Sequence, residues 1–196
     1  MIFSRISKLC CISLYSVPLL TACNSGSTAL SNPSVANIPY LIEANLTESS
    51  LQTLISIVNP VQYSINYLLN PEGGHSTIAY APSDQQYNNL EPYLTNNMHI
   101  VVSEYCWSDQ FGVEAARGTV YNSNNVQIVG TDPFQHITIS FESGKAAVDS
   151  NYLFECSSSN YNNYPYCAEN NLYITDLTCT QLANPITFSA TLYQAY

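Results

Sequence analysis

The chain of 196 residues carries 4 Lys and Arg against 14 Asp and Glu, which gives a formal net charge of −10. Proteins that bind long nucleic acids neutralise successive phosphates with Lys and Arg side chains, so this composition argues against a polymeric nucleic acid as partner. The length is sufficient for one domain with a hydrophobic core.

The first 22 residues have the pattern of a bacterial lipoprotein signal peptide. Arg5 and Lys8 form a basic start, an apolar stretch too short to span a membrane follows, and the string LTAC at 20–23 resembles a lipobox. We therefore expect cleavage before Cys23 and lipidation of that cysteine, for example with palmitate, which would anchor the protein in a bacterial cell envelope. Asn24 in the next position favours the outer membrane. The alternative is an ordinary secretory signal cleaved nearby, which would also place the protein outside the cytoplasm.

Two regions follow the signal. Residues 23–37 are predicted to be the lipidated cysteine and a flexible tether, because they are small, polar and contain proline. Residues 38–196 are predicted to form the folded domain. Loss of the signal would leave Arg117 and Lys145 against fourteen acidic residues, and 2 − 14 gives a net charge of −12.

The domain is predicted to contain few helices and many strands. Residues 51–58 have apolar side chains at helical spacing, and this helix should end before Pro60. Ser83 is a suitable N-cap for a second helix over 84–94, although Pro92 predicts a break near its end. Alternating or β-branched patterns predict strands at 61–69, 76–81, 99–106, 112–121, 126–129, 135–141, 172–177 and 186–193. The Ser-, Asn- and Tyr-rich segment 157–171 is predicted to be an exposed loop, and the whole pattern indicates an α+β class.

One four-residue pattern occurs twice, as HSTI at 75–78 and HITI at 136–139. Both copies lie in predicted strands, where residues two apart point to the same face. His75 and Thr77 should therefore share one face, and so should His136 and Thr138. A histidine can take or give a proton near neutral pH, and a threonine hydroxyl can hydrogen-bond a phosphoryl oxygen. Two such strands across a cleft could supply a general base, a general acid and two phosphate ligands.

Paired H-x-T-aliphatic motifs are the signature of the 2H phosphoesterase superfamily, which this chain resembles over residues 73–154. The sequence around the second motif, FQHITISFESGKAAVDSNYLF, is similar to the cyclic phosphodiesterase-like branch associated with tRNA ligases and RNA repair. The matching positions in that stretch are Gly144, Val148, Ser150, Asn151 and Leu153. The resemblance implies a two-lobed α+β fold, in which antiparallel sheets and a few helices flank a central cleft with one motif on each facing inner strand.

The resemblance also implies a hydrolase that opens a 2′,3′-cyclic phosphate, or a related 2′-linked phosphodiester, in a nucleotide-sized molecule. His75 and His136 would be the acid and base in an order that the sequence leaves open, and Thr77 and Thr138 would bind phosphate. Possible further substrate contacts are Ser140, Lys145, Ser150 and Asn151. No metal or other cofactor is expected. The alternative is an inactive envelope lipoprotein that uses the same fold to bind a ligand or a protein partner.

The remaining candidates have simpler interpretations. His99 lies in an alternating run without a following threonine and is expected to be structural. Cys106, Cys156, Cys167 and Cys179 lack the paired spacing of a zinc site, and in an oxidising compartment they are expected to form disulfides. Four cysteines allow three pairings, which the sequence leaves open.

Overall fold

The computed structural model describes residues 39–58, 63, 67–69, 73–131, 133–157 and 160–195. The predicted signal peptide, Cys23, the tether and most of the predicted strand at 61–69 lie outside this part of the chain. Contacts along the backbone divide the chain into residues 1–36 and 37–196, and every described residue belongs to the second unit. Within the described residues, no helix is both long enough and apolar enough to cross a membrane.

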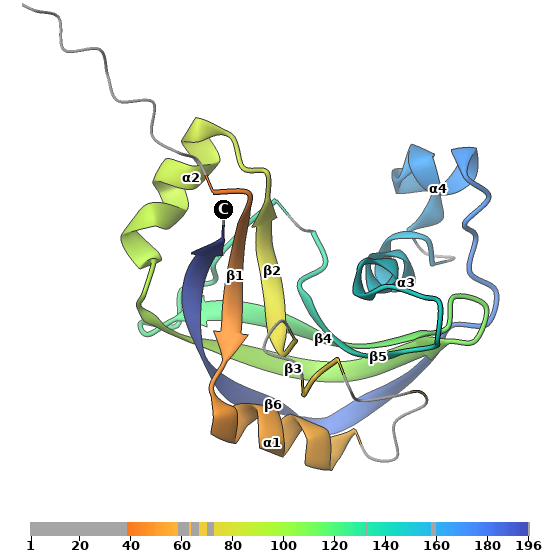
Figure 1. The fold of residues 1–196 in the computed structure, drawn as a ribbon, viewed down its shortest axis with the longest axis horizontal. Helices are drawn as coiled ribbons and strands as arrows, with labels where there is room; N and C mark the ends of the chain where they lie inside the picture. The colour runs from red at the N-terminus through yellow and green to blue at the C-terminus, as the bar shows by residue number, and fades with distance from the viewer. Residues whose placement is uncertain are drawn as a thin grey trace, which may run out of the picture. The chain divides into compact units, whose positions relative to one another are not determined.

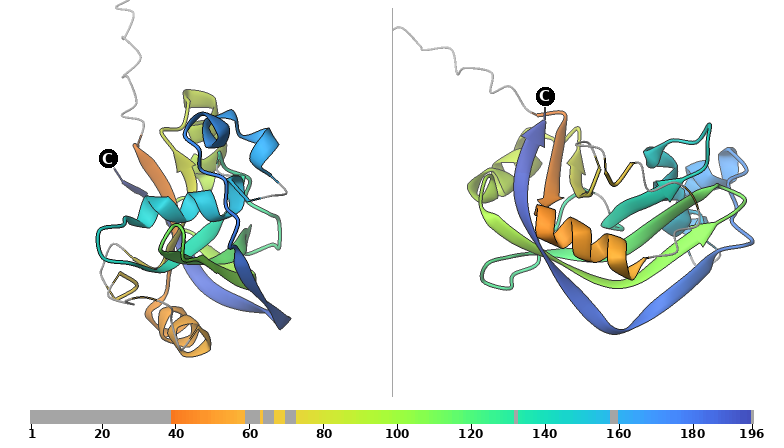
Figure 2. Two further views of the ribbon diagram at one scale, coloured as in Figure 1. Left: turned by 90° about the vertical axis from the view of Figure 1, so that its right-hand side faces the viewer. Right: turned by 60° about the horizontal axis from the view of Figure 1, so that its bottom comes forward.

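Six antiparallel strands form a closed barrel in the order β1-β2-β5-β4-β3-β6 (Figure 1). Their bounds are β1 Leu41–Leu46, β2 His75–Tyr80, β3 Asn97–Ser108, β4 Val113–Asn122, β5 His136–Phe141 and β6 Thr178–Ala195. The long strand β6 pairs with β1 at one end and with β3 along most of its length, and Figure 2 shows it curving around the outside of the sheet.

The barrel overturns the predicted two-lobed α+β fold. The two strands that carry the motifs are direct neighbours, because β2 and β5 pair through Ser76 and Ile137. With β6 joining β1 to β3, every strand has a partner on both sides, so the sheet is continuous and does not separate into facing lobes. More residues lie in strands than in helices, and the helices lie outside the barrel (Figure 1).

Several predicted strands are confirmed, and the others differ from the prediction in four ways. β1 was not predicted, the segment 172–177 contains no strand, and 126–129 contributes only an isolated bridge between Gln127 and Tyr121. β6 begins eight residues before the predicted Ile186, because the chain continues past Pro185. The register with β3 shifts there, between Val102 and Glu104, and such an irregularity accommodates a residue without an N–H.

The two predicted helices are confirmed with changed ends. Helix α1 (Glu48–Ile57) begins after Thr47, whose Oγ1 accepts a hydrogen bond from the backbone N–H of Ser50. Helix α2 (Asp84–Leu90) begins after Ser83 with a capping box. It ends earlier than predicted, and Pro92 lies in the following 3-10 turn η1 (Glu91–Tyr93).

Short helices follow β5, and two disulfides link parts of the chain. The elements are η2 Ala147–Ser150, α3 Asn151–Glu155, η3 Tyr161–Asn163 and α4 Pro165–Glu169. The predicted loop at 157–171 is therefore partly helical, and the disulfide between Cys156 and Cys167 ties α4 to the end of α3. A second disulfide joins Cys106 on β3 to Cys179 on β6. The prediction of disulfides is thus confirmed, and the pairing that the sequence left open is resolved.

Two hydrophobic clusters lie on opposite faces of the sheet. Ile78, Ile137 and Ile139 belong to the larger cluster inside the barrel. The smaller cluster contains Ala115 of β4 together with Leu153 and Phe154 of α3, so α3 packs over the outer face of β4. Because side chains alternate along a strand, the motif histidines and threonines lie on the face opposite the isoleucines, on the side covered by η2 and α3.

Candidate active site

A cavity of about 570 Å³ collects both motifs. It is bounded by β2, by β5 and by the segment from η2 to α3. The lining residues are Tyr67, His75, Thr77, Tyr80, Thr131, Pro133, His136, Thr138, Ala147, Val148, Ser150, Asn151 and Glu155. The structure therefore brings together all four motif side chains that the sequence singled out, although on neighbouring strands of one barrel.

The strand register explains how four side chains meet. Ser76 is paired with Ile137 in antiparallel orientation. This pair is flanked by His75 and Thr77 on β2 and by His136 and Thr138 on β5. Because residues two apart in a strand point to the same face, the four side chains leave the sheet on one face and line the same cavity.

His136 is buried, with 6% of its surface exposed, and both ring nitrogens have partners. Its Nδ1 lies 2.7 Å from the backbone oxygen of Phe134, and its Nε2 lies 3.0 Å from Oγ of Ser150. The ring also lies 5.5 Å from the ring of Phe154 on α3. A carbonyl oxygen can only accept, so Nδ1 carries a proton and Nε2 is the nitrogen that faces the hydroxyl.

The hydroxyl of Ser150 determines the protonation state that fits this arrangement. Ser150 Oγ donates its single proton to the backbone oxygen of Ala147 at 2.6 Å. Its contacts with Thr138 Oγ1 at 2.7 Å and His136 Nε2 at 3.0 Å must then both be accepted by Ser150. With the Ser150 hydroxyl in this orientation, the contacts of His136 fit a ring that donates from both nitrogens. If His136 were neutral, Ser150 would have to turn its proton away from Ala147, and only the 3.4 Å contact from Thr138 would remain for that carbonyl.

His75 has a more open environment. Its Nε2 lies 3.7 Å from Oε2 of Glu43 on β1, and the side chains of the two residues are 19% and 17% exposed. Asn45 donates from Nδ2 to the other carboxylate oxygen of Glu43 at 3.0 Å, which orients the carboxylate. Among the described residues, the ring of His75 is therefore held by this longer contact, and it stays partly accessible in the cavity.

The other predicted site residues divide into two groups. Ser150 and Asn151 line the cavity. Ser140 does not, because it is fully buried and donates to Oε2 of Glu114 at 2.7 Å. Lys145 is exposed in the turn after β5 and also lies outside the lining. His99 stacks on Tyr121 at 5.5 Å and does not line the cavity.

Sequence reasoning missed several residues of this cavity. Tyr67, Tyr80, Thr131, Pro133 and Glu155 belong to its wall, and none carries a local motif. Glu43 was missed because β1 was not predicted. From Ile42 to Leu46, apolar and polar residues alternate, and this pattern could have predicted a strand with Glu43 and Asn45 on one face.

Two shifted pKa values lie outside the cavity. Burial alone would raise the pKa of Asp176, but hydrogen bonds from the Ser108 hydroxyl and the Gln110 N–H lower it below its ordinary value. Burial and a hydrogen bond to Asp109 raise the pKa of Tyr63 well above its ordinary value. Both groups anchor the turn between β3 and β4, so these shifts reflect structural bonds.

One group of potential metal ligands occurs among the described residues, and it does not fit a metal. Glu104, Cys106 and Cys179 lie close together on β3 and β6. The two cysteines form a disulfide, which removes the thiolates that would bind a cation.

Comparisons with known proteins show the fold and leave the family open. No protein-family profile matches the sequence, and no curated protein matches it. The structure is similar to solved structures that include the crystal structure of a fungal RNA kinase, with a TM-score of 0.56 and 18% sequence identity. The match covers 84% of this chain and 47% of the kinase chain, so this chain spans about half the length of that structure. The barrel is therefore a fold that also occurs in an RNA-modifying enzyme.

Proposed function

We propose that this protein is a metal-independent phosphodiesterase of the 2H type, which opens a 2′,3′-cyclic phosphate or a related 2′-linked phosphodiester in a small nucleotide. The observation that carries this proposal is that both H-x-T-I motifs line one cavity. The similarity to an RNA kinase is consistent with a nucleotide-like ligand, but at 18% identity it supports the fold alone.

The proposed reaction adds water across one P–O bond. His75, the more accessible histidine, takes a proton from water as the water oxygen bonds to phosphorus. The bond from phosphorus to one ribose oxygen breaks, and His136 delivers its Nε2 proton to that oxygen. His75 ends protonated and His136 neutral, and proton exchange with solvent restores both. General acid and base groups of this kind each contribute about 10²–10⁴-fold to rate.

The hydrogen bonds of His136 support its role as the acid. An acid must hold a proton before the reaction, and the contacts with Ser150 and Phe134 fit the doubly protonated ring. Since Nδ1 is used by the Phe134 carbonyl, Nε2 is the nitrogen that can serve the substrate. In this scheme the leaving oxygen replaces Ser150 as the acceptor, while Thr77 and Thr138 hydrogen-bond the non-bridging oxygens.

Turnover of cyclic nucleotides tests the proposal. Purified protein should hydrolyse 2′,3′-cyclic nucleotides, ADP-ribose cyclic phosphate or 2′-5′ oligoadenylate, with a bell-shaped pH dependence and no loss of rate in EDTA. Activity that disappears with EDTA and returns with zinc would contradict the metal-independent mechanism. Binding of these compounds without turnover would favour the alternative, an envelope protein that binds a ligand or partner.

We further propose that residues 1–22 are removed and that Cys23 is lipidated, which places the protein at a bacterial outer membrane. The string LTAC at 20–23 supports this proposal. Mass spectrometry of the protein from a bacterial envelope fraction tests it. A mature chain that begins at Cys23 without acyl groups would contradict it.

A further inference from the structure

A second cavity adjoins the proposed active site. Its volume is about 470 Å³, and its wall comes from β4 and the segment before β5. Thr131 and Pro133 line both cavities, so the two cavities share this part of their wall. The side chain that distinguishes the second cavity is Arg117, which is 46% exposed and lies directly opposite His136 in the pairing of β4 with β5.

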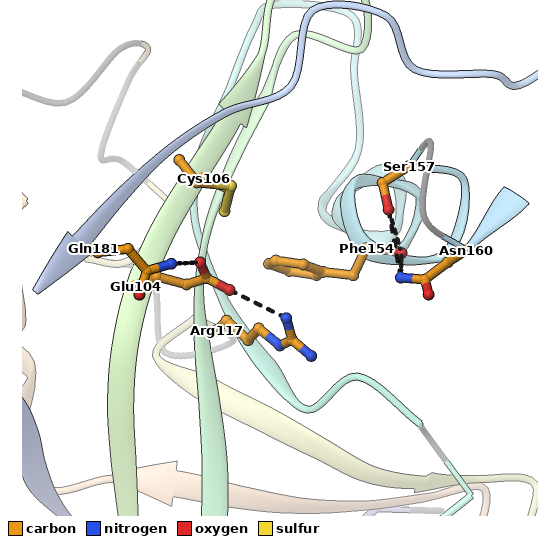
Figure 3. A network of polar contacts seen from close by, with 8 residues as sticks. Glu104, Cys106, Arg117, Phe154, Ser157, Asn160 and Gln181 are labelled. Atoms are coloured by element: carbon orange, nitrogen blue, oxygen red, sulfur yellow. Dashed lines mark hydrogen bonds and ion pairs between the residues drawn. A yellow bond between two sulfur atoms is a disulfide. The ribbon is translucent and has the colours of Figure 1, made fainter.

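Arg117 is held in position from several sides (Figure 3). Its Nη1 lies 3.2 Å from Oε1 of Glu104, and Gln181 donates to the other carboxylate oxygen of Glu104. The guanidinium lies 5.5 Å from the ring centre of Phe134 and 5.8 Å from that of Phe154. Such contacts preorganise the guanidinium plane, so that a ligand does not have to immobilise a flexible side chain.

The position of Phe154 is itself supported by hydrogen bonds. Asn160 Nδ2 donates to the backbone oxygen of Phe154 at 2.8 Å, and Ser157 Oγ donates to the same oxygen at 3.1 Å (Figure 3). These bonds fix the end of α3, from which the ring of Phe154 reaches both Arg117 and His136. The segment that supports the arginine therefore also supports the proposed catalytic acid.

Arg117 retains capacity to bind an anion. A guanidinium has five N–H donors in a planar fork that matches phosphate, and the described residues accept one of them, through Glu104. Arg117 and Lys145 are the only Lys or Arg beyond residue 8 of this acidic chain, and Lys145 lines neither cavity. A cation placed in a hollow beside the active site is thus an exception on a protein with a net charge of −10.

We propose that the second cavity binds a second phosphate group of the substrate, with Arg117 as its ligand. This inference rests on the proposed function and specifies the substrate class: a nucleotide that carries a terminal cyclic phosphate in the first cavity and a further phosphate that reaches Arg117 past Thr131 and Pro133. Nucleoside 5′-phosphates with a 2′,3′-cyclic phosphate belong to this class, and so do ADP-ribose cyclic phosphate and short oligonucleotides with a cyclic end.

The test compares two substrates that differ only in the second phosphate. Adenosine 2′,3′-cyclic phosphate and its 5′-phosphorylated form are hydrolysed by wild type and R117M, and the ratio of their KM values is measured. We expect KM to be about tenfold lower for the 5′-phosphorylated substrate in wild type, because charge-assisted hydrogen bonds are strong. In R117M the ratio should fall to about one. K145M is the matched control, because it removes one positive charge outside both cavities and should retain the wild-type ratio.

A second variant tests whether the changed KM ratio in R117M comes from lost phosphate binding or from a destabilised fold. R117M leaves the carboxylate of Glu104 without its ion-pair partner, and this residue is only 9% exposed. The double variant E104Q/R117M removes both charges and should show the same ratio near one, with thermal unfolding close to that of wild type. Equal KM values for both substrates in wild type, or an unchanged ratio in R117M and E104Q/R117M, would overturn the inference while leaving the proposed hydrolysis intact.

Equilibrium binding distinguishes the two proposals if no substrate is hydrolysed. Calorimetry with adenosine 3′-phosphate and adenosine 3′,5′-bisphosphate reports the second phosphate without turnover. Bisphosphate that binds about tenfold more tightly to wild type, and no more tightly to R117M, would support the Arg117 site even though the proposed activity had failed. Equal affinity of wild type for the two nucleotides would overturn the site.

Discussion

The two copies of the H-x-T-I pattern have nearly the same sequence and very different surroundings. His136 on β5 is buried, and its two nitrogens contact Phe134 and Ser150. His75 on β2 is more open, and the polar contact that it makes among the described residues is with a carboxylate 3.7 Å away. The difference comes from other segments: η2 and α3 cover the second motif, and β1 lies beside the first. A repeated motif therefore does not imply repeated roles.

Replacing each histidine should have the largest effect on activity. H136N keeps a donor near the Phe134 carbonyl but removes Nε2, and H75N removes the proposed base. Either change should lower kcat by about 10²–10⁴-fold, the usual contribution of a general acid or base. H99N is the matched control, since His99 lies outside the cavity, and it should retain wild-type kcat. Hydrolysis that survived either active-site replacement would remove the basis for the mechanism.

Removing the hydroxyl that holds the acid should have the next largest effect. In S150A the imidazolium of His136 loses the oxygen that accepts its Nε2 proton, so it should lose that proton more readily. The alkaline limb of the pH–rate profile should then move to lower pH, and kcat at neutral pH should fall about tenfold, as expected for a hydrogen bond to a charged group.

The matched control for S150A is S140A, which removes another buried serine hydroxyl that does not line the cavity. Its pH profile should match that of wild type. A shift of the acidic limb in S150A would reverse the roles assigned to the two histidines.

Part of the fold was predictable from local patterns. The alternation in HITISF at 136–141 correctly placed isoleucines in the core and His136 and Thr138 on the other face. The choice between two lobes and one barrel was not predictable in this way. It depends on the pairing of Ser76 with Ile137, which are about sixty residues apart and have no local signal for each other.

The candidate site shows the same division. The motif residues could be found because a two-residue spacing on a strand fixes a common face. The difference between the histidines could not, because it depends on the hydrogen bonds that Ser150 makes with His136, Thr138 and the Ala147 carbonyl. Arg117 was visible in the sequence only as a rare cation, and its position opposite His136 emerges from the register of β4 with β5.

A smaller effect on kcat is expected from a change beside His75, the more exposed of the two motif histidines. E43Q keeps the shape of the Glu43 side chain but removes its charge beside His75. Partly exposed ion pairs contribute about 0.2–1 kcal/mol, so kcat should fall only about two- to fivefold. E142Q, at an exposed carboxylate outside the cavity, should leave kcat unchanged. A loss in E43Q as large as that in H75N would mean that Glu43 takes part directly in proton transfer.

The inner faces of the two motif strands also differ, and this difference should affect stability alone. Ile137 fills its place in the core, whereas the paired residue Ser76 is fully buried and its Oγ has no hydrogen-bond partner among the described residues. A buried hydroxyl without a partner costs about 1–3 kcal/mol, and alanine removes it while leaving the strand intact.

S76A should therefore raise the free energy of unfolding by about 1 kcal/mol, seen as a higher urea midpoint with an unchanged slope. Its kcat should stay at the wild-type value, because Ser76 points away from the cavity that His75 and Thr77 line. Destabilisation by S76A would show that the hydroxyl has a partner in solution, and a lower kcat would show that packing beneath β2 positions His75. Either result would mean that the first motif is supported from inside the barrel, as the second is supported by Ser150 from outside it.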